Sequence, residues 1–429
     1  MSETTPSGWK RTTFKSICRS LVNGGTPDTG NGKYWGGNTP WVTGADFISS
    51  GIGEIRRYVS EAGVRSSSTN IVRAGNLLLV TRTGVGKLAI APSDIAISQD
   101  ITGIYLDENE ADSGFVYFLM KQGVEDLKKR NQGTSINGII RSDLEGYVVK
   151  IPCSLTEQKR IASILATLES AIEKTEALIA KYQQIKAGLM HDLFTCGVTA
   201  DGKLRPPREQ APELYQETKI GWVPKEWGAP RIGDIFDIQL GKMLNKLAKT
   251  GKWMTPYLGN RAVQWDFVDC SAIEEMDFSP TEREKYSLIP GDLLVCEGGD
   301  VGRTAMWRGE LEVCYFQKAI HRLRPKSNRA LSTFMLRYMR FAKESGYFRE
   351  FTSQSSIAHL TQEKLGAIPM LLPKPDEQYL IAERFDAIDR LIQNEQSNLS
   401  KLHQKKLGLM HDLLTGKVRA KIHGQENTI

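Results

Sequence analysis

The sequence predicts an α+β protein in which two pseudo-repeated mixed α/β domains are separated by two long helices that pair as an antiparallel coiled coil. Two observations support this prediction. The second half of the chain repeats the first, and each copy ends in a helical segment with a seven-residue apolar period. A length of 429 residues is also too great for one ordinary core and suits two or three domains.

The repeat is clearest near the end of each half. The letters GLMHDL at 188–193 recur without change at 408–413, which is 220 positions later, and the same offset pairs Gln158 with Gln378. Upstream the letters diverge while the order of features persists. Such a pattern indicates a duplicated domain that keeps its fold and varies its surface.

Each half contains the same predicted strand, turn and strand. Apolar runs at 75–80 and 291–296 are followed by glycine-rich turns, 84–87 and 298–303, that close on a basic residue. Aromatic stretches with helical spacing follow at 115–121 and 334–341, and a polar loop follows each stretch, at 132–136 and 354–357. The two halves are therefore predicted to share one order of elements.

Two long helices end the two halves. Between Thr156 and Leu193 there is no proline, and the apolar residues follow an alternating four-three rhythm that the second copy repeats. About 37 residues at roughly 1.5 Å each give a rod of about 55 Å, whose apolar stripe needs a partner. The predicted pairing seam is Ile161, Leu165, Leu168, Ile172 and Ile179 with Ile381, Phe385, Ile388, Ile392 and Leu399.

Polar residues interrupt this seam and are expected to set its register; they are Thr175, Lys186, Glu395 and Lys406. The alternative is two separate amphipathic helices, each docked on its own domain. The matched length and matched stripe favour the pair.

These features divide the chain into six parts. Proline, glycine and charge at 197–212 are typical of a linker. The expected order is a first domain at 1–151, a long helix at 152–196, a linker at 197–219, a second domain at 220–372, a second long helix at 373–416 and a tail at 417–429.

Composition restricts the class of protein. The formal charge of +6 is compatible with nucleic acid, and the first ten residues lack the apolar core of a signal peptide. No stretch approaches the ~20 apolar residues of a membrane span, so we expect a cytoplasmic protein without a membrane partner. Six cysteines without a C-x-x-C pair fit reduced thiols and predict no metal site.

The order of parts, with several local motifs, resembles the specificity subunit of type I restriction-modification systems over essentially the whole chain. Both helix starts carry the Glu-Gln pair of that family, at 157–158 and 377–378. The other motifs are GGTP at 24–27, YWGG at 34–37, PWV at 40–42, GWVP at 221–224, GKM at 241–243 and PYLGN at 256–260. In order and duplicated, these motifs are specific.

The resemblance implies a DNA-reading role. Each domain would be a target-recognition domain for one half of an asymmetric, bipartite double-stranded DNA target, and the paired helices would fix the gap. The helices would also hold two methyltransferase (M) subunits, which bring S-adenosylmethionine, and motor-nuclease (R) subunits would join them. We expect this chain itself to bind no cofactor.

The residues predict no catalysis. Adenine methylation needs an Asn- or Asp-Pro-Pro-aromatic motif, whereas the only Pro-Pro pair lies at 206–207 between arginines. The segment 81–87 lacks the first glycine and the Ser or Thr of a phosphate loop. His191 and His411 have no partner ligand nearby in sequence, which favours packing or subunit contact.

DNA reading needs basic groups for phosphates and Arg, amide or hydroxyl groups for base edges. Such residues gather in the predicted loops, where each is equally compatible with a solvated surface charge. The candidates are Lys33, Tyr34, Arg82, Lys87, Asn131 and Gln132 in the first domain, and Lys242, Asn245, Lys246, Lys249, Lys252, Arg261 and Arg303 in the second.

Two other classes of protein stay open from the sequence. A self-contained DNA-cleaving enzyme with a related recognition module would need a third domain, and the repeat uses both halves of the chain. A coiled-coil adaptor that never contacts DNA would not need basic glycine-rich turns at equivalent places in both halves.

Overall fold

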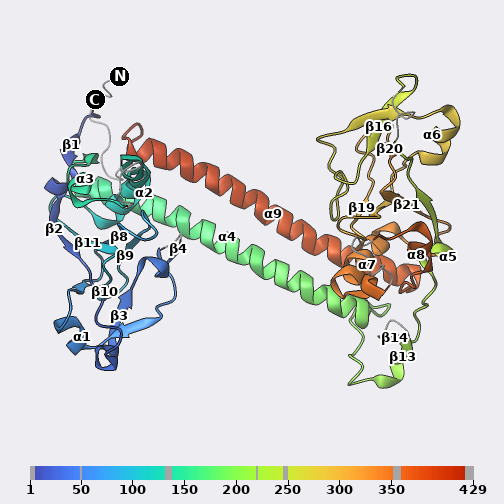
Figure 1. Cartoon of the computed structure of the whole chain (residues 1–429), viewed down its shortest axis with the longest axis horizontal. Coiled ribbons are helices and arrows are strands. Elements are labelled where there is room, and N and C mark those ends of the chain that lie inside the picture. Colours follow the sequence, from blue (N-terminus) through green and yellow to red (C-terminus); the bar gives the residue numbers. More distant parts are fainter. Residues whose placement is uncertain are drawn as a thin grey trace. The chain divides into compact units, whose positions relative to one another are not determined.

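The computed structural model describes residues 5–48, 51–130, 138–218, 221–244, 250–350 and 359–420. The chain divides into two compact units: residues 1–176 with 397–429, and residues 177–396. Each unit therefore contains one mixed α/β domain, the first part of one long helix and the last part of the other. In Figure 1, residues 1–176 of the first unit are coloured from blue to green, and residues 177–396 of the second from green to orange.

The first unit contains two four-stranded sheets, with strand orders β2-β11-β8-β9 and β6-β3-β10-β7. A short pair, β4 with β5, and the antiparallel pair β1 with β12 complete its strands. The bounds are β1 Trp9–Thr13, β2 Cys18–Asn23, β3 Trp35–Val42, β4 Phe47–Ile48, β5 Gly51–Ile52, β6 Arg57–Val59, β7 Asn70–Val72, β8 Leu77–Val80, β9 Leu88–Ile90, β10 Ile95–Ile97, β11 Ile101–Leu106 and β12 Val148–Pro152. Its helices are α1 Glu61–Arg65, α2 Ser113–Arg130 and α3 Arg141–Glu145.

The second unit repeats most of this topology and adds an antiparallel pair, β13 with β14. Its four-stranded sheet has the order β15-β21-β18-β19, and its three-stranded sheet has the order β17-β16-β20. The strands are β13 Tyr215–Thr218, β14 Gly221–Pro224, β15 Phe236–Leu240, β16 Met254–Leu258, β17 Glu274–Asp277, β18 Leu293–Cys296, β19 Thr304–Met306, β20 Tyr315–Phe316 and β21 Ile320–Pro325. The helices are α5 Ile232–Ile235, α6 Pro280–Tyr286, α7 Ser332–Glu344 and α8 Gln362–Ala367.

The four-stranded sheet that contains β2 in the first domain corresponds strand by strand to the one that contains β15 in the second, whereas the other sheet has four strands in the first domain and three in the second. Both domains contain an antiparallel four-stranded sheet in the same order, and in both the other sheet has one parallel pair, β3 with β10 and β16 with β20. The predicted strand-turn-strand is β8 to β9 in one domain and β18 to β19 in the other, and the predicted helices are α2 and α7. This confirms the predicted α+β class.

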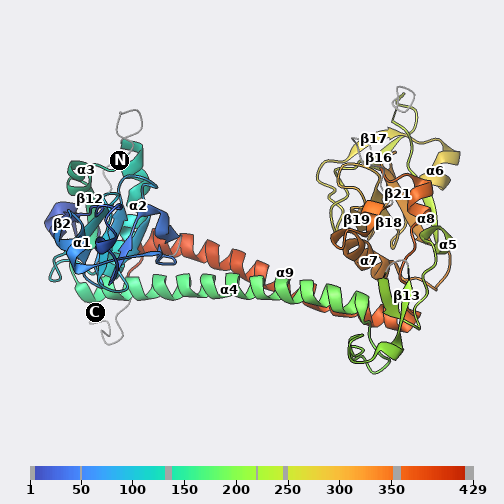
Figure 2. The same ribbon diagram turned by 60° about the horizontal axis from the view of Figure 1, so that its bottom comes forward.

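Two long helices follow the domains: α4, Leu155–Thr195, and α9, Pro375–Leu414. In the first unit, Ile161 and Leu165 of α4 lie in the domain core together with Leu413 and Leu414 of α9. In the second unit the roles are reversed, because Ile381 and Phe385 of α9 share a core with Leu193 and Phe194 of α4. Each domain core is thus completed by the start of one long helix and the end of the other (Figures 1 and 2).

An ion network marks where the helices run side by side within each unit. In the first unit, Glu169 of α4 accepts hydrogen bonds from Lys121 of α2 and Lys406 of α9, both at 2.7 Å. In the second, Asp389 of α9 contacts Arg337 of α7 at 2.8 Å and Lys186 of α4 at 2.6 Å. Burial raises the pKa of Glu169, but the two lysines outweigh burial and lower it below its ordinary value.

The remaining predicted seam residues differ in burial. Ile172, Ile179 and Ile388 are buried, whereas Leu168, Ile392 and Leu399 are half-buried. Of the predicted polar seam positions, Lys186 and Lys406 form the ion pairs just described, and the Thr175 hydroxyl donates to the carbonyl of Ala171 in its own helix. Burial is therefore greatest where the helices meet the domains.

The Gln of each Glu-Gln pair ties a long helix to its domain. The side chain of Gln158 donates to the carbonyls of Glu110 and Pro152 and accepts from the Asp112 amide. Gln378 makes the same three bonds: its side chain donates to the carbonyls of Arg329 and Pro373 and accepts from the Leu331 amide. Both side chains are fully buried, so the duplicated glutamine serves to pair buried backbone groups.

The segment predicted as a linker at 197–219, which the structure describes up to residue 218, is part of the second unit and packs within it. Arg205 is buried and ion-paired with Glu377, and the backbone amide of Val198 donates to the same carboxylate at 2.9 Å. β13 pairs with β14 just beyond. No helix in the described ranges is both long and apolar enough to cross a membrane.

Candidate nucleic-acid interface

The strand ends of the first domain converge on one set of loops, residues 24–26, 43–47, 81–87, 98–100 and 138–139, which we call loop edge 1. The turn after β8 is closed by two backbone hydrogen bonds of 2.8 Å, from Val80 to the carbonyl of Lys87 and from Gly86 to the carbonyl of Val80. Thr81 connects this turn to two others, because its amide donates to Asp100 at 2.7 Å and its carbonyl accepts from Ile139 at 2.9 Å.

The second domain builds the same framework from 241–243, 259–261, 297–303, 317–319 and 359–360, which we call loop edge 2. Two backbone hydrogen bonds close its turn: the amide of Cys296 donates to the carbonyl of Arg303 at 2.8 Å, and the amide of Gly302 donates to the carbonyl of Cys296 at 3.0 Å. Glu297 occupies the position that corresponds to Thr81. Its backbone amide donates to the carbonyl of Ala319 at 2.9 Å, and its carbonyl accepts from the amide of Leu360 at 2.8 Å. The two loop edges are therefore equivalent bond by bond.

A close backbone contact at a glycine is also duplicated in the two domains. The amide of Gly24 donates to the carbonyl of Ile101 at 3.3 Å, and the amide of Gly241 donates to the carbonyl of Ile320 at 3.1 Å. A Cβ on Gly24 would overlap the carbonyl oxygen of Ile97 at the end of β10, and a Cβ on Gly241 would overlap that of Gln317 just after β20. Only glycine permits this approach, which explains the glycines at both sites in the sequence.

The basic residue that closes each glycine-rich turn has a partner inside its own domain. Lys87 donates to the carbonyls of Gly44 and Phe47 at 3.1 and 2.8 Å. Arg303 donates to the carbonyl of Asn260 at 2.9 Å. Both bonds join the turn to the loop after β3 or β16, so these predicted DNA contacts have a bracing role in the structure.

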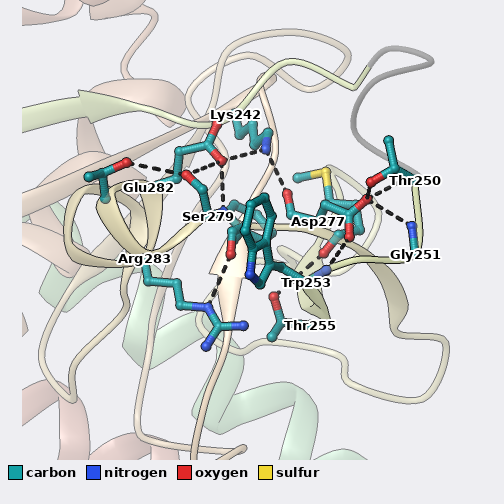
Figure 3. Close-up of polar contacts among 12 residues, drawn as sticks. Lys242, Thr250, Gly251, Trp253, Thr255, Asp277, Ser279, Glu282 and Arg283 are labelled. Carbon is teal, nitrogen blue, oxygen red and sulfur yellow. Dashed lines mark hydrogen bonds and ion pairs between the residues drawn. The ribbon is translucent and has the colours of Figure 1, made fainter.

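Asp277 organises the loop that leads into β16 (Figure 3). Its carboxylate accepts from the backbone amides of Gly251 and Trp253 at 3.0 and 2.6 Å, and from the hydroxyl of Thr250 at 2.7 Å. Backbone donation, first from Trp253, lowers the pKa of Asp277 to about 2. These bonds fix the backbone on both sides of Lys252, whose ammonium lies 4.4 Å from the centroid of the Trp253 ring.

Lys242, another predicted DNA contact, is tied to the same region. Its ammonium donates to the carbonyl of Asp277 at 2.6 Å and to the carboxylate of Glu282 at 2.8 Å (Figure 3). It also lies 5.2 Å from the centroid of the Phe278 ring. Glu282 also caps α6 by accepting from Ser279. The charge of Lys242 is thus matched within the domain.

The other predicted contacts lie in three places. Arg82 is exposed on loop edge 1 and Arg261 on loop edge 2. Lys33 and Tyr34 lie together beside α1, where the Ser60 hydroxyl donates to the carbonyl of Lys33. The predicted contacts Asn131, Gln132, Asn245, Lys246 and Lys249 lie outside the described residues.

The structure adds polar groups that the sequence interpretation missed. Gln99 and Lys318 are exposed on the two loop edges, while Asn260 and Gln317 are half-exposed on the second. Gln99 accepts a hydrogen bond from Thr26. Three of these four residues lie one or two positions after a short buried strand, β10 or β20. That position is the sequence signal that identifies them.

Comparison with protein families places the chain in a class whose members determine DNA specificity. The family model described as "Type I restriction modification DNA specificity domain" matches twice, at residues 6–184 and 224–404. The chain belongs to this family, and it is a type I restriction-modification specificity subunit with two recognition domains.

Individual relatives extend over most of the chain. It is similar to the type I restriction enzyme MjaVIII specificity subunit of Methanocaldococcus jannaschii, with 24% identity over 86% of this chain and 85% of that protein. The putative MjaX specificity subunit of the same organism is 22% identical over 97% of this chain and 95% of the relative.

Solved structures show the same fold. The type I S subunit of M. genitalium superposes with a TM-score of 0.57 at 17% identity, covering 96% of this chain and 97% of the other. The HsdS subunit of Thermoanaerobacter tengcongensis gives a TM-score of 0.51 at 16% identity, with coverage of 97% and 99%.

Proposed function

We propose that this chain is the DNA-reading subunit of a type I restriction-modification complex and that each loop edge reads one half of an asymmetric, two-part target in double-stranded DNA. The observation that supports this proposal is the duplicated loop framework. The same backbone bonds recur in both domains, while the residues at matching positions differ: Arg82, which is exposed, matches the half-buried Gly298, and the exposed Ala45 matches the exposed Arg261. One scaffold with two sets of side chains suits two different half-sites.

In this proposal the chain performs no chemistry of its own. The two long helices fix the gap between the half-sites and dock two methyltransferase subunits, which would bind S-adenosylmethionine and transfer its methyl group. Motor-nuclease subunits would join the same complex. The ion networks at Glu169 and Asp389 support the first part, because each fixes a domain helix to both long helices.

The test is adenine-methylation mapping of a host genome with and without this chain, co-expressed with the methyltransferase of its own system. The expected result is a methylated, asymmetric two-part motif that appears only when the chain is present. If a verified complex with an active methyltransferase produces no new motif, the proposal is wrong and a coiled-coil adaptor is the better interpretation.

A further inference from the structure

Because the two loop edges share one backbone framework, positions in the two domains can be matched without sequence identity. Thr81 and Glu297 make the same two bonds, so Arg82 corresponds to Gly298. The carbonyls of Gly44 and Asn260 accept from Lys87 and Arg303, so Ala45 corresponds to Arg261. Ser98 and Gln317 correspond, since their amides donate to Val42 and Leu258 at 3.0 and 3.1 Å.

Some basic residues of the loop edges bond to their own domain, and others do not. Lys87 and Arg303 occupy the same position and make the same kind of internal bond, which is the behaviour of scaffold. Arg82 and Arg261 occupy different positions, both are exposed, and within the described part of the chain neither side chain has a hydrogen-bond or ion-pair partner. An arginine without an internal partner keeps its full set of donors for a ligand.

The second loop edge also has a hollow of about 600 Å³. Asn260, Arg261 and Gln317 line one part of it, and the acidic residues Asp269 and Glu274 line another. The Gln317 amide nitrogen lies 3.1 Å from the place that a Cβ on Gly259 would occupy. The side-chain amide of Gln317 makes no hydrogen bond to any residue that the structure describes. Its counterpart Ser98 is 1% exposed and cannot reach a ligand.

We infer that Arg82 in the first domain, and Arg261 together with Gln317 in the second, read base edges in the DNA target. The chemistry fits this role, because guanidinium groups pair in bidentate fashion with guanine and glutamine amides pair with adenine in the major groove. This inference rests on the proposed function and goes further by naming the residues. It also explains an asymmetric target, since the two domains place their arginine at different points of one framework.

The experiment maps methylation with the whole complex assembled on the R82A, R261A and Q317A variants. R82A relaxes base preference in one half of the motif, by about 10- to 100-fold at one base pair. R261A and Q317A relax the other half and leave the first intact. The same purified complexes are compared for melting temperature, which stays near that of wild type because these side chains have no hydrogen-bond or ion-pair partner among the residues that the structure describes.

Two matched controls keep the test specific. Arg73 precedes β8, whereas Arg82 follows it, and Arg308 follows β19 at the end away from the glycine-rich turn. Both are exposed, and Arg73 differs from Arg82 in forming an ion pair with Asp94 at 3.1 Å. R73A and R308A leave both halves of the motif unchanged. A further variant, G259A, keeps the Gln317 amide but displaces it, and relaxes the same half as Q317A.

The outcomes separate the two proposals. A wild-type motif that keeps all its bases in R82A, R261A and Q317A overturns the assignment of these residues and leaves the proposed function standing. Relaxation of both halves by any one variant, or by the control variants, also overturns it. If the wild-type chain gives no motif at all, the proposed function fails and this inference fails with it.

Discussion

Single side chains in this protein hold loops by collecting backbone groups. Gln158 and Gln378 each pair three buried backbone groups, and Asp277 gathers amides at the base of a basic loop. The sequence marked both glutamines through the repeat but gave them no role. The sequence did not point to Asp277. This residue ends β17, whereas the corresponding strand of the first domain, β6, ends in Val59, so the repeat does not mark the position.

Asp277 makes the loop sensitive to acid. A carboxylate whose pKa is lowered on folding contributes stability above its unfolded pKa of about 3.8 and loses that contribution as the pH falls toward about 2. We expect D277N to unfold at a lower temperature than wild type, with a constant difference down to about pH 5 that narrows below about pH 4. Thermal unfolding between pH 3 and 7 measures this. A difference that persists unchanged at the acid end would contradict the assigned contacts.

At the scale of elements, the long helices were the part best predicted from sequence. Their apolar period, their shared length and the repeated Glu-Gln starts gave boundaries within a few residues of α4 and α9. The sequence alone treated the seam as one continuous stripe. In the structure Ile161, Leu165, Ile381 and Phe385 lie in domain cores, since a periodic pattern does not say which neighbour covers each residue.

The middle of the seam can be tested apart from the domain cores. Ile172 is 5% exposed and lies between the Glu169–Lys406 and Glu176–His403 contacts of the paired helices. I172D places a charge in an apolar contact and should cost about 3 kcal/mol of unfolding free energy, measured by urea denaturation. The control is I185D, the same change on the same helix at a residue that is 41% exposed. Equal stability of the two variants would show that Ile172 is not in a helix contact.

The loops show the limit of prediction at this scale. Glycine-rich turns were located correctly on both sides, yet Lys87, Lys242 and Arg303 make bonds inside their domains. A basic residue in a loop has the same letter whether it braces a carbonyl or faces solvent. Only the placement of Gly44, Asp277 and Asn260 distinguishes the two, and those residues are distant in sequence.

At the scale of the whole chain, each domain core includes residues from the start of one long helix and the end of the other. Neither core is therefore made from one continuous stretch of sequence. Leu413 and Leu414 complete the first core, more than 250 residues after its last strand begins. The repeat predicted two equal domains, and it could not show this exchange, because identical letters at 188–193 and 408–413 do not say which core receives them.

A truncation tests the exchange. Ending the chain after Gln396 removes Leu413 and Leu414 but keeps Ile381 and Phe385. We expect the first domain to lose several kcal/mol of stability, detected as rapid proteolysis within 1–151, while the second domain keeps its protection. The full-length variant L407A, altered at a residue 71% exposed, serves as the control. Unchanged protection of the first domain in the truncated chain would refute its dependence on α9.

The same exchange sets an order of events during synthesis. When the second domain leaves the ribosome, Leu193 and Phe194 are already present, so its core can close as soon as Phe385 emerges. The first domain has all its strands by residue 152 but must wait for Leu413 and Leu414. At 5–20 residues per second this interval is roughly 10–50 s, during which apolar surface on the nascent first domain is uncovered. Chaperone binding early in translation is therefore expected for the first domain, although it is made first.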